Sequence, residues 1–408
     1  MKCRHCANEL KLPLVDLASA PPSNAYLTEQ SLHAPEKWFP LRVLVCEQCW
    51  LAQTEDFAQA DELFDADYAY FSGFSTSWLA HSERYVTDMS TRFGLDAQSH
   101  VVEVAANDGY LLQYVKARGI PCTGVEPTAS TAAVARAKGI DIVEAFFGVE
   151  LAKILVAEGK QADLTAANNV LAHVPDINDF AAGFALLLKE RGVATFEFPH
   201  LSKLLAETQF DTIYHEHFSY LSLTAVQRIF AANGLAVFDV EELPTHGGSL
   251  RVYAQRADTG QHATSARVAQ VLTAEKASGM LSTEHYRDFQ VRTDRIKYEL
   301  IRFLLDAKRD GKRVAAYGAA AKGNTLLNYA GIRADLIDFV VDRNPAKQDK
   351  YMPGSRISIV SEERLKQEKP DYVLILPWNL KAELEVQLGY VKEWGGKLVT
   401  AIPRLEIA

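Results

Sequence analysis

Short apolar runs alternate with amphipathic helical patterns through the middle of the chain. Five runs are strand candidates, 100–105, 122–126, 140–144, 163–169 and 193–198. Two later runs, 235–243 and 248–254, predict a closing antiparallel pair. Alternation of this kind predicts an α/β fold, in which helices cover both faces of a mostly parallel sheet and ligands bind at the carboxyl ends of strands.

The pattern changes on either side of this region. Residues 312–408 repeat the alternation in the runs RVAAYG, LIDFVVD, YVLILP and KLVTAI, which predict a smaller Rossmann-like sheet. Residues 258–308 carry apolar positions at helical spacing and predict helix. The first 75 residues contain several prolines and are expected to be rich in loops.

Composition narrows the classes of partner. The chain has 408 residues, a net charge of −9 and a pI near 5.7, with no block of Lys and Arg, which argues against nucleic acid as a partner. No apolar run approaches the ~20 residues that cross a bilayer, and MKCRHCANEL does not have the pattern of a signal peptide. We therefore expect a soluble, cytoplasmic protein without a membrane partner.

Four of the five cysteines form two CxxC pairs, Cys3 with Cys6 and Cys46 with Cys49. Each pair is a tight turn that offers two thiolates to one tetrahedral ion, so we expect a closed, structural zinc site. The alternative is four buried thiols without metal. Cys122 stands in an apolar segment and is expected to be an inert core thiol.

The turn after the first strand of the middle region reads EVAANDGYLLQY, residues 103–114. Glu103 ends the strand, and Glu126 ends the next strand 23 residues later, where an acid can accept both ribose hydroxyls of an adenosine cofactor. The turn lacks GxGxxG and basic residues, so Glu103, Asn107 and Asp108 favour S-adenosylmethionine over NAD. An ordinary strand–turn–helix is the alternative interpretation.

The heptad YHEHFSY, residues 214–220, allows three interpretations. His215 and His217 could form an H-x-H metal site, or the segment could be a half-buried loop. In an acid/base cluster, a histidine would remove a proton from carbon, a carboxylate would orient its ring and Tyr214 would bond an enolate oxygen. The acid/base interpretation fits best if a methyl group of S-adenosylmethionine goes to carbon, because that transfer needs a base.

Two motifs resemble class I methyltransferases. EVAANDG is similar to the family's E-x-G-x-G-x-G motif: Glu103 and Gly109 match, while Ala105 and Asn107 replace two glycines. TAANNVLAHVPD resembles the fourth-strand motif. The resemblance assigns these residues to the cofactor: Glu103, Asn107, Asp108, Gly109, Glu126, Phe147, Asn168 and Asn169.

Over nearly its full length the chain resembles the deoxysugar C-methyltransferases. The shared motifs are the cysteine pairs, NDGYLLQY, NNVLAHVPD, FDTIYHEHFSYLS, THGGSLRVYA and AAYGAAAKGNTLLNY. The resemblance implies C-methylation of a nucleoside-diphosphate 4-keto-6-deoxy sugar, at C-3' by preference, with Tyr214, Glu216, His217 and His173 in the active site and His217 as base. It also implies four parts: a zinc-binding domain (1–75), a methyltransferase domain (76–245), a strand and helical connection (246–311) and a Rossmann-like domain that binds the sugar nucleotide (312–408).

The segment YGAAAKGNT, residues 317–325, nearly spells a P-loop but has Asn324 where the lysine should follow. A helix N-terminus with Lys322 can hold a diphosphate. With the family resemblance, the predicted substrate residues are Tyr70, Phe71, Ser72, His246, Arg251, Lys322, Asn324 and Asp342. Four alternatives stay open, a purely structural C-terminal domain, an NAD(P)-dependent sugar oxidoreductase, an O- or N-methyltransferase and an inactive zinc scaffold.

Overall fold

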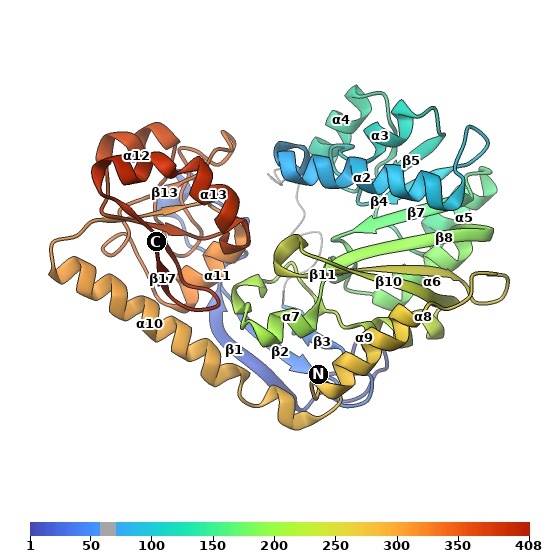
Figure 1. Cartoon of the computed structure of the whole chain (residues 1–408), viewed down its shortest axis with the longest axis horizontal. Coiled ribbons are helices and arrows are strands. Elements are labelled where there is room, and N and C mark those ends of the chain that lie inside the picture. The colour runs from blue at the N-terminus through green and yellow to red at the C-terminus, as the bar shows by residue number, and fades with distance from the viewer. Residues whose placement is uncertain (58–70) are drawn as a thin grey trace.

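The computed structural model describes residues 1–57 and 71–408, which form three β-sheets (Figure 1). The largest has seven strands in the order β10-β11-β8-β7-β4-β5-β6. Its strands are β4 Val101–Val104, β5 Cys122–Val125, β6 Asp141–Val143, β7 Ala162–Asn168, β8 Leu188–Pro199, β10 Leu235–Leu243 and β11 Ser249–Arg256.

Only β11 runs antiparallel to its neighbours in this sheet, so the predicted closing pair is confirmed. This strand order and the single reversed strand define the class I methyltransferase fold, as predicted. Helices cover both faces, and their bounds are α2 Thr76–Phe93, α3 Leu112–Ala117, α4 Ala129–Ala137, α5 Val149–Ala157, α6 Ile177–Leu187 and α8 Leu223–Ala232. A further helix, α7 Leu201–Ala206, packs in the core of the other two sheets.

Residues buried on the two faces of this sheet form separate cores. One face packs against α2, α3 and α4 through residues such as Tyr85 and Leu112. The other packs against α6 and α8 through Phe184 and Ile229. The strands are buried on both sides, as all four residues of β4 show, which explains why they read as continuous apolar runs.

The C-terminal sheet is parallel except for its last strand, and its order is β14-β13-β12-β15-β16-β17. The strands are β12 Val314–Tyr317, β13 Val340–Val341, β14 Ile359–Val360, β15 Tyr372–Ile375, β16 Lys397–Thr400 and β17 Glu406–Ile407. Its helices are α11 Ala321–Tyr329, α12 Glu362–Glu368 and α13 Lys381–Gln387. The predicted Rossmann-like sheet is therefore present.

The prediction of helix throughout 258–308 is wrong in part. The structure has α9 Ala266–Ala277 and α10 Phe289–Arg309, with a turn and one 3₁₀ turn between them. Gly279 adopts φ +93°, a left-handed conformation that ends the first helix. The apolar spacing continues on both sides of this break, so periodicity alone does not reveal it.

The first 75 residues are expected to be rich in loops, and most of the described residues 1–57 do lie outside helices and strands. The region also contains strands that the sequence does not predict. A four-stranded sheet, in the order β1-β2-β3-β9, begins here with β1 Leu12–Ala20, β2 Phe39–Val45 and β3 Ala52–Thr54. Pro13 lies within β1, an edge strand, where a missing N–H is tolerated. The fourth strand, β9 Ser219–Tyr220, comes from the end of the heptad.

The N-terminal sheet joins the other two sheets. It shares one core with the C-terminal sheet, to which Leu17, Val43 and Leu374 belong, and α10 runs along the outside of both (Figure 1). Eight 3₁₀ turns complete the described residues, η1 Ser31–His33, η2 Ser72–Phe74, η3 Leu171–His173, η4 Phe210–Thr212, η5 Thr245–Gly247, η6 Thr283–Tyr286, η7 Trp378–Leu380 and η8 Gly389–Trp394. Across residues 1–57 and 71–408, no helix combines the length and apolarity needed to span a bilayer.

Candidate active site

A cavity of about 790 Å³ lies where the three sheets meet. One wall is formed by the carboxyl ends of β4, β5 and β7, as expected for a parallel sheet. A second wall is the heptad, and a third is the turn that precedes α11. The cavity therefore brings together residues that are hundreds of positions apart in the sequence.

The turn after β4 has an unusual backbone. Ala105 and Asn107 adopt φ +61° and +47°, the left-handed region that glycine favours. The backbone N–H of Asn107 donates to Glu126 Oε2 at 2.9 Å, and Thr128 donates to Oε1 at 2.9 Å. Gly109 is needed, because a Cβ there would lie 2.4 Å from Ile140. The turn thus keeps a glycine-type path although two glycines are replaced.

Buried polar atoms at this end fit a cofactor with an ammonium and a ribose. Glu103 is fully buried, and neither carboxylate oxygen accepts a hydrogen bond of normal geometry. Burial raises the pKa of Glu103 well above its usual range. The side-chain oxygens of Asn168 and Asn169 are also buried without a partner. Such orphaned acceptors call for a donor that a bound ligand provides.

The predicted cofactor residues fall into two groups. Asn107, Glu126, Phe147, Asn168 and Asn169 line the cavity. Glu103, Asp108 and Gly109 lie outside its lining, and Asp108 and Gly109 make hydrogen bonds within the protein. The Asp108 carboxylate, for instance, accepts from the N–H of Gly73 at 3.2 Å.

In the heptad, His217 lies in the cavity wall and is held by a backbone contact. Its Nδ1 lies 2.8 Å from the carbonyl oxygen of Thr212, which can only accept, so Nδ1 carries the proton. Nε2 is then the basic nitrogen. The ring centroid lies 4.0 Å from that of Tyr214 and 4.6 Å from that of His173.

Burial keeps these histidines neutral. It lowers the pKa of His217 well below its usual range, and the neighbouring His173 lowers it further. Burial also lowers the pKa of His173 to about 4. All three predicted partners, Tyr214, Glu216 and His173, line the cavity with His217.

Glu216 is oriented by a residue that the sequence analysis missed. Asn24 Nδ2 donates to both carboxylate oxygens, at 2.7 and 2.9 Å. Asn24 follows two prolines in a loop of the N-terminal region, and nothing in its local sequence indicates a site. Asp56, Trp78 and Lys347 also line the cavity and were missed for the same reason. Tyr110 lines it too and was missed although it follows Gly109 in the cofactor motif.

The H-x-H metal interpretation does not fit the geometry. His215 turns away from the cavity, and its Nε2 lies 3.2 Å from each of the carbonyl oxygens of Phe39 and Pro40. Within residues 1–57 and 71–408, the only metal-type group of three or more side chains is formed by the four cysteines. The two histidines of the heptad thus have different surroundings.

The wall from the C-terminal sheet contributes two lysines. Lys322, in the first turn of α11, donates to Asn379 Oδ1 at 2.7 Å and lies 4.9 Å from the centroid of the Trp378 ring. Burial lowers its pKa, and the nearby Asp211 opposes that shift. Lys347 donates to the carbonyl of Ala319 at 2.8 Å. This wall is therefore the cationic side of the cavity.

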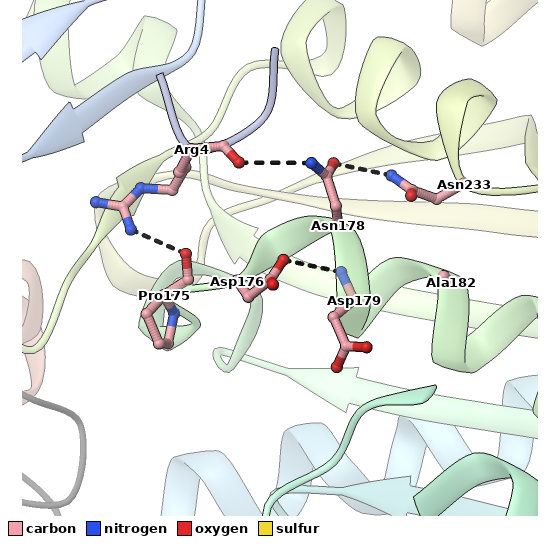
Figure 2. Close-up of a pocket in the computed structure, with 7 residues that line it drawn as sticks. All are labelled: Arg4, Pro175, Asp176, Asn178, Asp179, Ala182 and Asn233. Carbon is pink, nitrogen blue, oxygen red and sulfur yellow. Dashed lines mark hydrogen bonds between the residues drawn. The ribbon is translucent and has the colours of Figure 1, made fainter. Parts of the chain in front are cut away.

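A second, open pocket of about 660 Å³ adjoins the cavity, and Pro175, Asp176 and Asp179 line both. Figure 2 shows it between the first cysteine pair and α6, with Arg4 on one side and Asn178 and Asp179 on the other. The Asn178 amide donates to the carbonyl of His5 at 2.9 Å and accepts from Asn233 at 3.0 Å. These contacts fasten the cysteine pair to the methyltransferase sheet.

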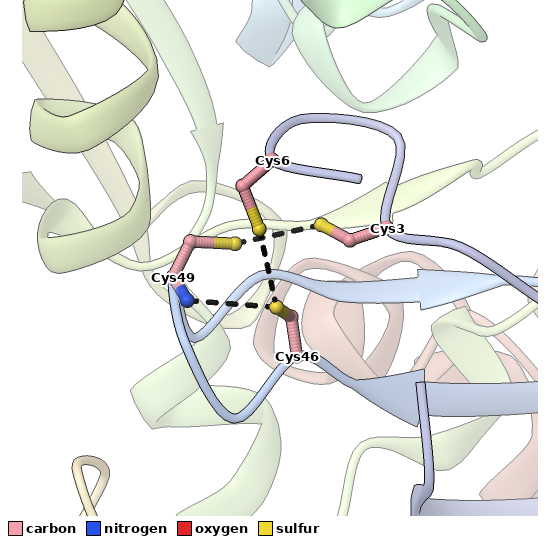
Figure 3. A group of neighbouring side chains, drawn as sticks. All are labelled: Cys3, Cys6, Cys46 and Cys49. Carbon is pink, nitrogen blue, oxygen red and sulfur yellow. Dashed lines mark hydrogen bonds between the residues drawn. The ribbon is translucent and has the colours of Figure 1, made fainter. Parts of the chain in front are cut away.

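The four cysteines converge as expected for zinc (Figure 3). All sulfurs lie within 4.8 Å of one another, and two pairs are 3.5 Å apart. A tetrahedral ion with Zn–S bonds of ~2.3 Å needs sulfurs ~3.8 Å apart. N–H groups also reach the sulfurs, since Gln53 Nε2 lies 3.3 Å from Cys3 Sγ and Cys49 N lies 3.5 Å from Cys46 Sγ. The four-thiolate set therefore fits a closed structural zinc site.

The predicted substrate residues are dispersed. Ser72, His246 and Lys322 line the cavity, and the His246 ring packs edge-on against Trp78 at 5.3 Å. Phe71 does not belong to the lining. Tyr70 lies outside the described residues.

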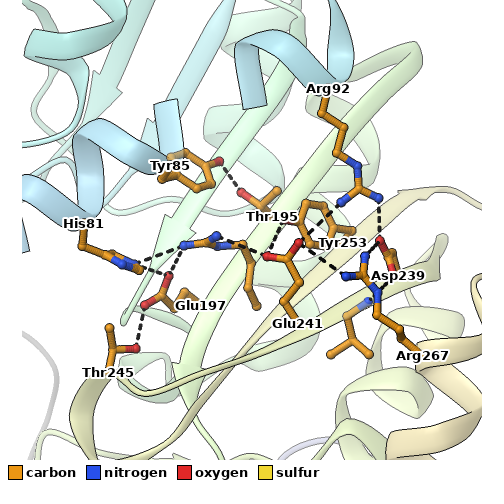
Figure 4. A network of polar contacts seen from close by, with 12 residues as sticks. His81, Tyr85, Arg92, Thr195, Glu197, Asp239, Glu241, Thr245, Tyr253 and Arg267 are labelled. Carbon is orange, nitrogen blue, oxygen red and sulfur yellow. Dashed lines mark hydrogen bonds and ion pairs between the residues drawn. The ribbon is translucent and has the colours of Figure 1, made fainter. Parts of the chain in front are cut away.

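Arg251, Asn324 and Asp342 do not line the cavity either. Glu197 and His81 belong to a buried ion network (Figure 4), in which Arg251 Nη2 donates to Glu197 at 2.8 Å. The Arg251 guanidinium also lies 4.9 Å from the centroid of the Tyr85 ring. Asn324 Nδ2 donates to the carbonyl of Ser23 at 2.5 Å. Asp342 accepts from the backbone of Ala319 and Asn344, at 2.8 Å each. These contacts are made within the protein, while Asn324 Oδ1 and Arg251 Nε are buried without a partner. A substrate contact for the three residues stays a prediction.

Comparisons with known proteins identify the family of this chain. The family model described as "Putative zinc binding domain" matches residues 3–64, "Methyltransferase domain" matches 78–240 and "C-methyltransferase C-terminal domain" matches 244–403. The C-methyltransferase NovU of Streptomyces niveus is 35% identical over 402 residues, covering 98% of this chain and 95% of that protein. The chain therefore belongs to the C-methyltransferase family.

Among solved structures, the magnesium protoporphyrin IX methyltransferase of Synechocystis, with S-adenosylhomocysteine bound, is 14% identical. It matches 44% of this chain and 83% of its own, with a TM-score of 0.35. The PH0226 protein of Pyrococcus horikoshii is also 14% identical, matches 46% and 95%, and has a TM-score of 0.37.

The protein is thus an S-adenosylmethionine-dependent C-methyltransferase with an N-terminal zinc-binding domain. The predictions of the class, of the cofactor and of zinc are confirmed. The oxidoreductase alternative is not favoured by these comparisons.

Proposed function

We propose that this enzyme methylates C-3' of a nucleoside-diphosphate 4-keto-6-deoxy sugar through an enolate. The 4-keto group acidifies the proton on the neighbouring carbon, and His217 Nε2 removes it. The observation that carries this assignment is the 2.8 Å contact of Nδ1 with the Thr212 carbonyl. It fixes the tautomer whose unprotonated nitrogen is Nε2, which a general base requires.

The low pKa of His217 fits this role only with substrate bound. An imidazole neutral at pH 7 is ready to accept a proton, but a pKa far below 7 makes it a weak base. A substrate diphosphate and a developing enolate both add negative charge to the cavity, which favours the imidazolium and raises its pKa. The base would thus strengthen as the enolate forms.

Other residues stabilise the enolate and hold the ligands. The Tyr214 ring lies against His217, and in this proposal its hydroxyl donates to the enolate oxygen. Asn24 holds the Glu216 carboxylate, which orients the sugar. Lys322 and Lys347 on the cationic wall face the diphosphate.

The wall formed by the methyltransferase sheet holds S-adenosylmethionine. Glu126 accepts the ribose hydroxyls, and Asn168 and Asn169 face the methionine end. Phe147 packs against the adenosine. When bound, the cofactor supplies an electrophilic methyl group.

The test is to incubate the enzyme with S-adenosylmethionine and a panel of dTDP-, GDP- and CDP-4-keto sugars. Mass spectrometry should find one sugar that gains one methyl group. In deuterated water without cofactor, the enzyme should exchange the proton next to the ketone. His217→Asn should lose both reactions by roughly 100-fold or more, as expected for loss of a general base.

His215→Asn is the matched control, because its ring bonds backbone carbonyls away from the cavity. It should keep both reactions within about threefold of wild type, the scale of an indirect effect. Wild-type exchange in His217→Asn together with loss of exchange in His173→Asn would move the base to the fourth-strand motif. Methylation of an oxygen or nitrogen in every sugar tested would refute the enolate route.

A further inference from the structure

We propose that Arg4, between the first two zinc ligands, is a positioning residue for the active site, because it ties the zinc site to the segments that carry His217 and His173. This inference rests on the proposed function, in which His217 is the base. It makes the zinc-binding domain part of the catalytic framework.

The Arg4 guanidinium binds three segments that form the cavity wall. Nη1 donates to the carbonyl of Pro175 at 3.1 Å (Figure 2), two residues beyond His173. Nη2 donates to Asp56 Oδ1 at 2.8 Å and to the carbonyl of Thr54 at 3.0 Å. The guanidinium also lies 5.4 Å from the ring centroid of Phe218, which follows His217. Pro175, Asp56 and Phe218 all line the cavity, and Arg4 contacts them from behind.

The backbone provides a second connection to the same wall. The Arg4 N–H donates to Gln53 Oε1 at 2.9 Å, and Gln53 lies opposite Ser219 in the β3–β9 pair. The next residue, Thr54, donates from its hydroxyl to the carbonyl of His217 at 3.1 Å and from its N–H to that of Phe218 at 3.1 Å. The strand that leaves the second cysteine pair therefore fixes the backbone at the base.

The zinc site itself does not need the Arg4 side chain. The N–H groups that reach the sulfurs come from Cys49, Gln53 and Asn8. The Arg4 side chain is nonetheless only 4% exposed, while its partner Asp56 is 47% exposed. Burying a guanidinium behind a part-exposed carboxylate is costly unless its N–H groups bind other acceptors. Here carbonyls of the cavity wall accept from Nη1 and Nη2, while Nε has no partner.

The geometry that Arg4 holds is the one that proton transfer needs. His173 and His217 come from separate segments, yet their ring centroids lie 4.6 Å apart. Arg4 binds the carbonyl beyond His173 and the ring beyond His217, so it fixes their separation. A displacement of about 1 Å at a reacting group costs on the order of 100-fold in rate.

Arg4→Gln tests the proposal in the full-length zinc-loaded enzyme. It should retain about one zinc per chain, the stoichiometry of a four-thiolate site, and bind S-adenosylmethionine within about twofold of wild type. With the sugar nucleotide, kcat should fall roughly 10- to 100-fold while KM changes by less than about threefold. Arg4→Lys should recover part of kcat, since one ammonium can still bind one carbonyl.

A measurement without substrate separates this proposal from the proposed function. In protein labelled with ¹⁵N-histidine, the signal absent from His217→Asn identifies His217. The wild type should show only the Nδ1–H tautomer, and Arg4→Gln should show a mixture. A wild type that methylates no sugar nucleotide would refute the proposed function, whereas the tautomer comparison would still decide the role of Arg4.

Arg228→Gln is the matched control. Arg228 is exposed on α8 and its Nη1 donates to the carbonyl of Gln48, between the second pair of cysteines, from the outer side. This variant should keep wild-type kcat and tautomer. Zinc-loaded Arg4→Gln with wild-type kcat would overturn the proposal, and so would loss of zinc together with loss of cofactor binding.

If Arg4→Gln does not fold, Thr54→Val tests whether the N-terminal region positions His217 through β3. It removes only the hydroxyl that donates to the His217 carbonyl and leaves the Thr54 N–H in place. The expected loss in kcat is smaller, roughly 3- to 10-fold for one hydrogen bond, with unchanged zinc content. Wild-type kcat in this variant would refute positioning through β3.

Discussion

The seven-stranded sheet and the C-terminal sheet both border the cavity with a turn that joins a parallel strand to a helix. In the larger sheet, Glu126 follows β5 and accepts the backbone N–H of Asn107 in the turn after β4, at 2.9 Å. In the C-terminal sheet, Asp342 follows β13 and accepts the backbone N–H of Ala319 in the turn after β12, at 2.8 Å. In both sheets, the second carboxylate oxygen accepts from the N–H two residues further on.

The difference lies in what each turn presents to the cavity. The first turn is long, and its acid is part of the lining, as is Asn107. The second turn is short, so the helix start and Lys322 line the cavity while Asp342 does not. An acid at the end of the second strand thus builds the turn in both sheets. In the proposed function, only the acid that lines the cavity, Glu126, binds a ribose.

The largest effect is expected for His246, which also lines the cavity, and it concerns the pH dependence of stability. Burial lowers its pKa to about 4, and Lys322 of the second turn contributes to the shift. A histidine with a lowered folded pKa stabilises the fold fully above its unfolded pKa of ~6.5, and this stability is lost as pH falls toward 4. His246→Asn, which tolerates the observed φ of +55°, removes the group that titrates.

The free energy of unfolding of His246→Asn, relative to wild type, should therefore improve by about 2–3 kcal/mol between pH 7 and 4.5. Urea titrations of both proteins at several pH values measure this. Burial raises the pKa of Asp211 to about 6, so its contribution to stability changes with pH in the opposite direction. Both proteins contain Asp211, so this contribution cancels in the comparison. A pH-independent difference would mean that His246 titrates normally.

Glu126→Ala should give the next largest effect and separates the two turns directly. Loss of two charge-assisted hydrogen bonds to the ribose should weaken S-adenosylmethionine binding by about 2–3 kcal/mol, roughly 30- to 150-fold. Asp342→Ala removes the matching carboxylate of the other turn and should leave that affinity unchanged. Calorimetry with S-adenosylmethionine measures both. Equal losses in the two variants would show that the acids act only by building their turns.

The sequence predicts the strands well and the pairing of distant segments poorly. Runs such as VVEV in β4 are buried on both faces, so their composition alone marks them as strands. β9 has only two residues, and its pairing with β3 depends on the fold of the whole N-terminal region. For the same reason Asn24, which holds Glu216, has no signal in its own neighbourhood.

The same contrast between local signals and distant contacts holds for the site residues. His217, Glu126 and Lys322 stand in local motifs, and all three line the cavity. Arg251 also stands in a motif, but its Nη2 donates to Glu197 on the neighbouring strand. A motif therefore identifies a residue that matters, while its role depends on the partners that tertiary structure brings to it.

Lys322→Met tests whether the lysine next to the second turn binds the diphosphate. Loss of one ammonium contact to a diphosphate should raise KM for the sugar nucleotide by about 10- to 30-fold, or 1.5–2 kcal/mol. The affinity for S-adenosylmethionine should not change. Lys138→Met is the control, because Lys138 donates to the carbonyl of Asp108 behind the first turn. An unchanged KM in Lys322→Met would place the diphosphate elsewhere.

The smallest effect is expected for Asp342→Asn. Asn keeps one acceptor oxygen but places an NH₂ group against the second backbone N–H, so the variant should lose about 1 kcal/mol of stability. KM for the sugar nucleotide and the affinity for S-adenosylmethionine should stay within about twofold, because Asp342 is not part of the lining. Urea unfolding, steady-state kinetics and calorimetry measure these quantities. NADH binding by the wild type that is lost in Asp342→Asn would instead identify Asp342 as a ribose acceptor, and the two turns would then both be nucleoside sites.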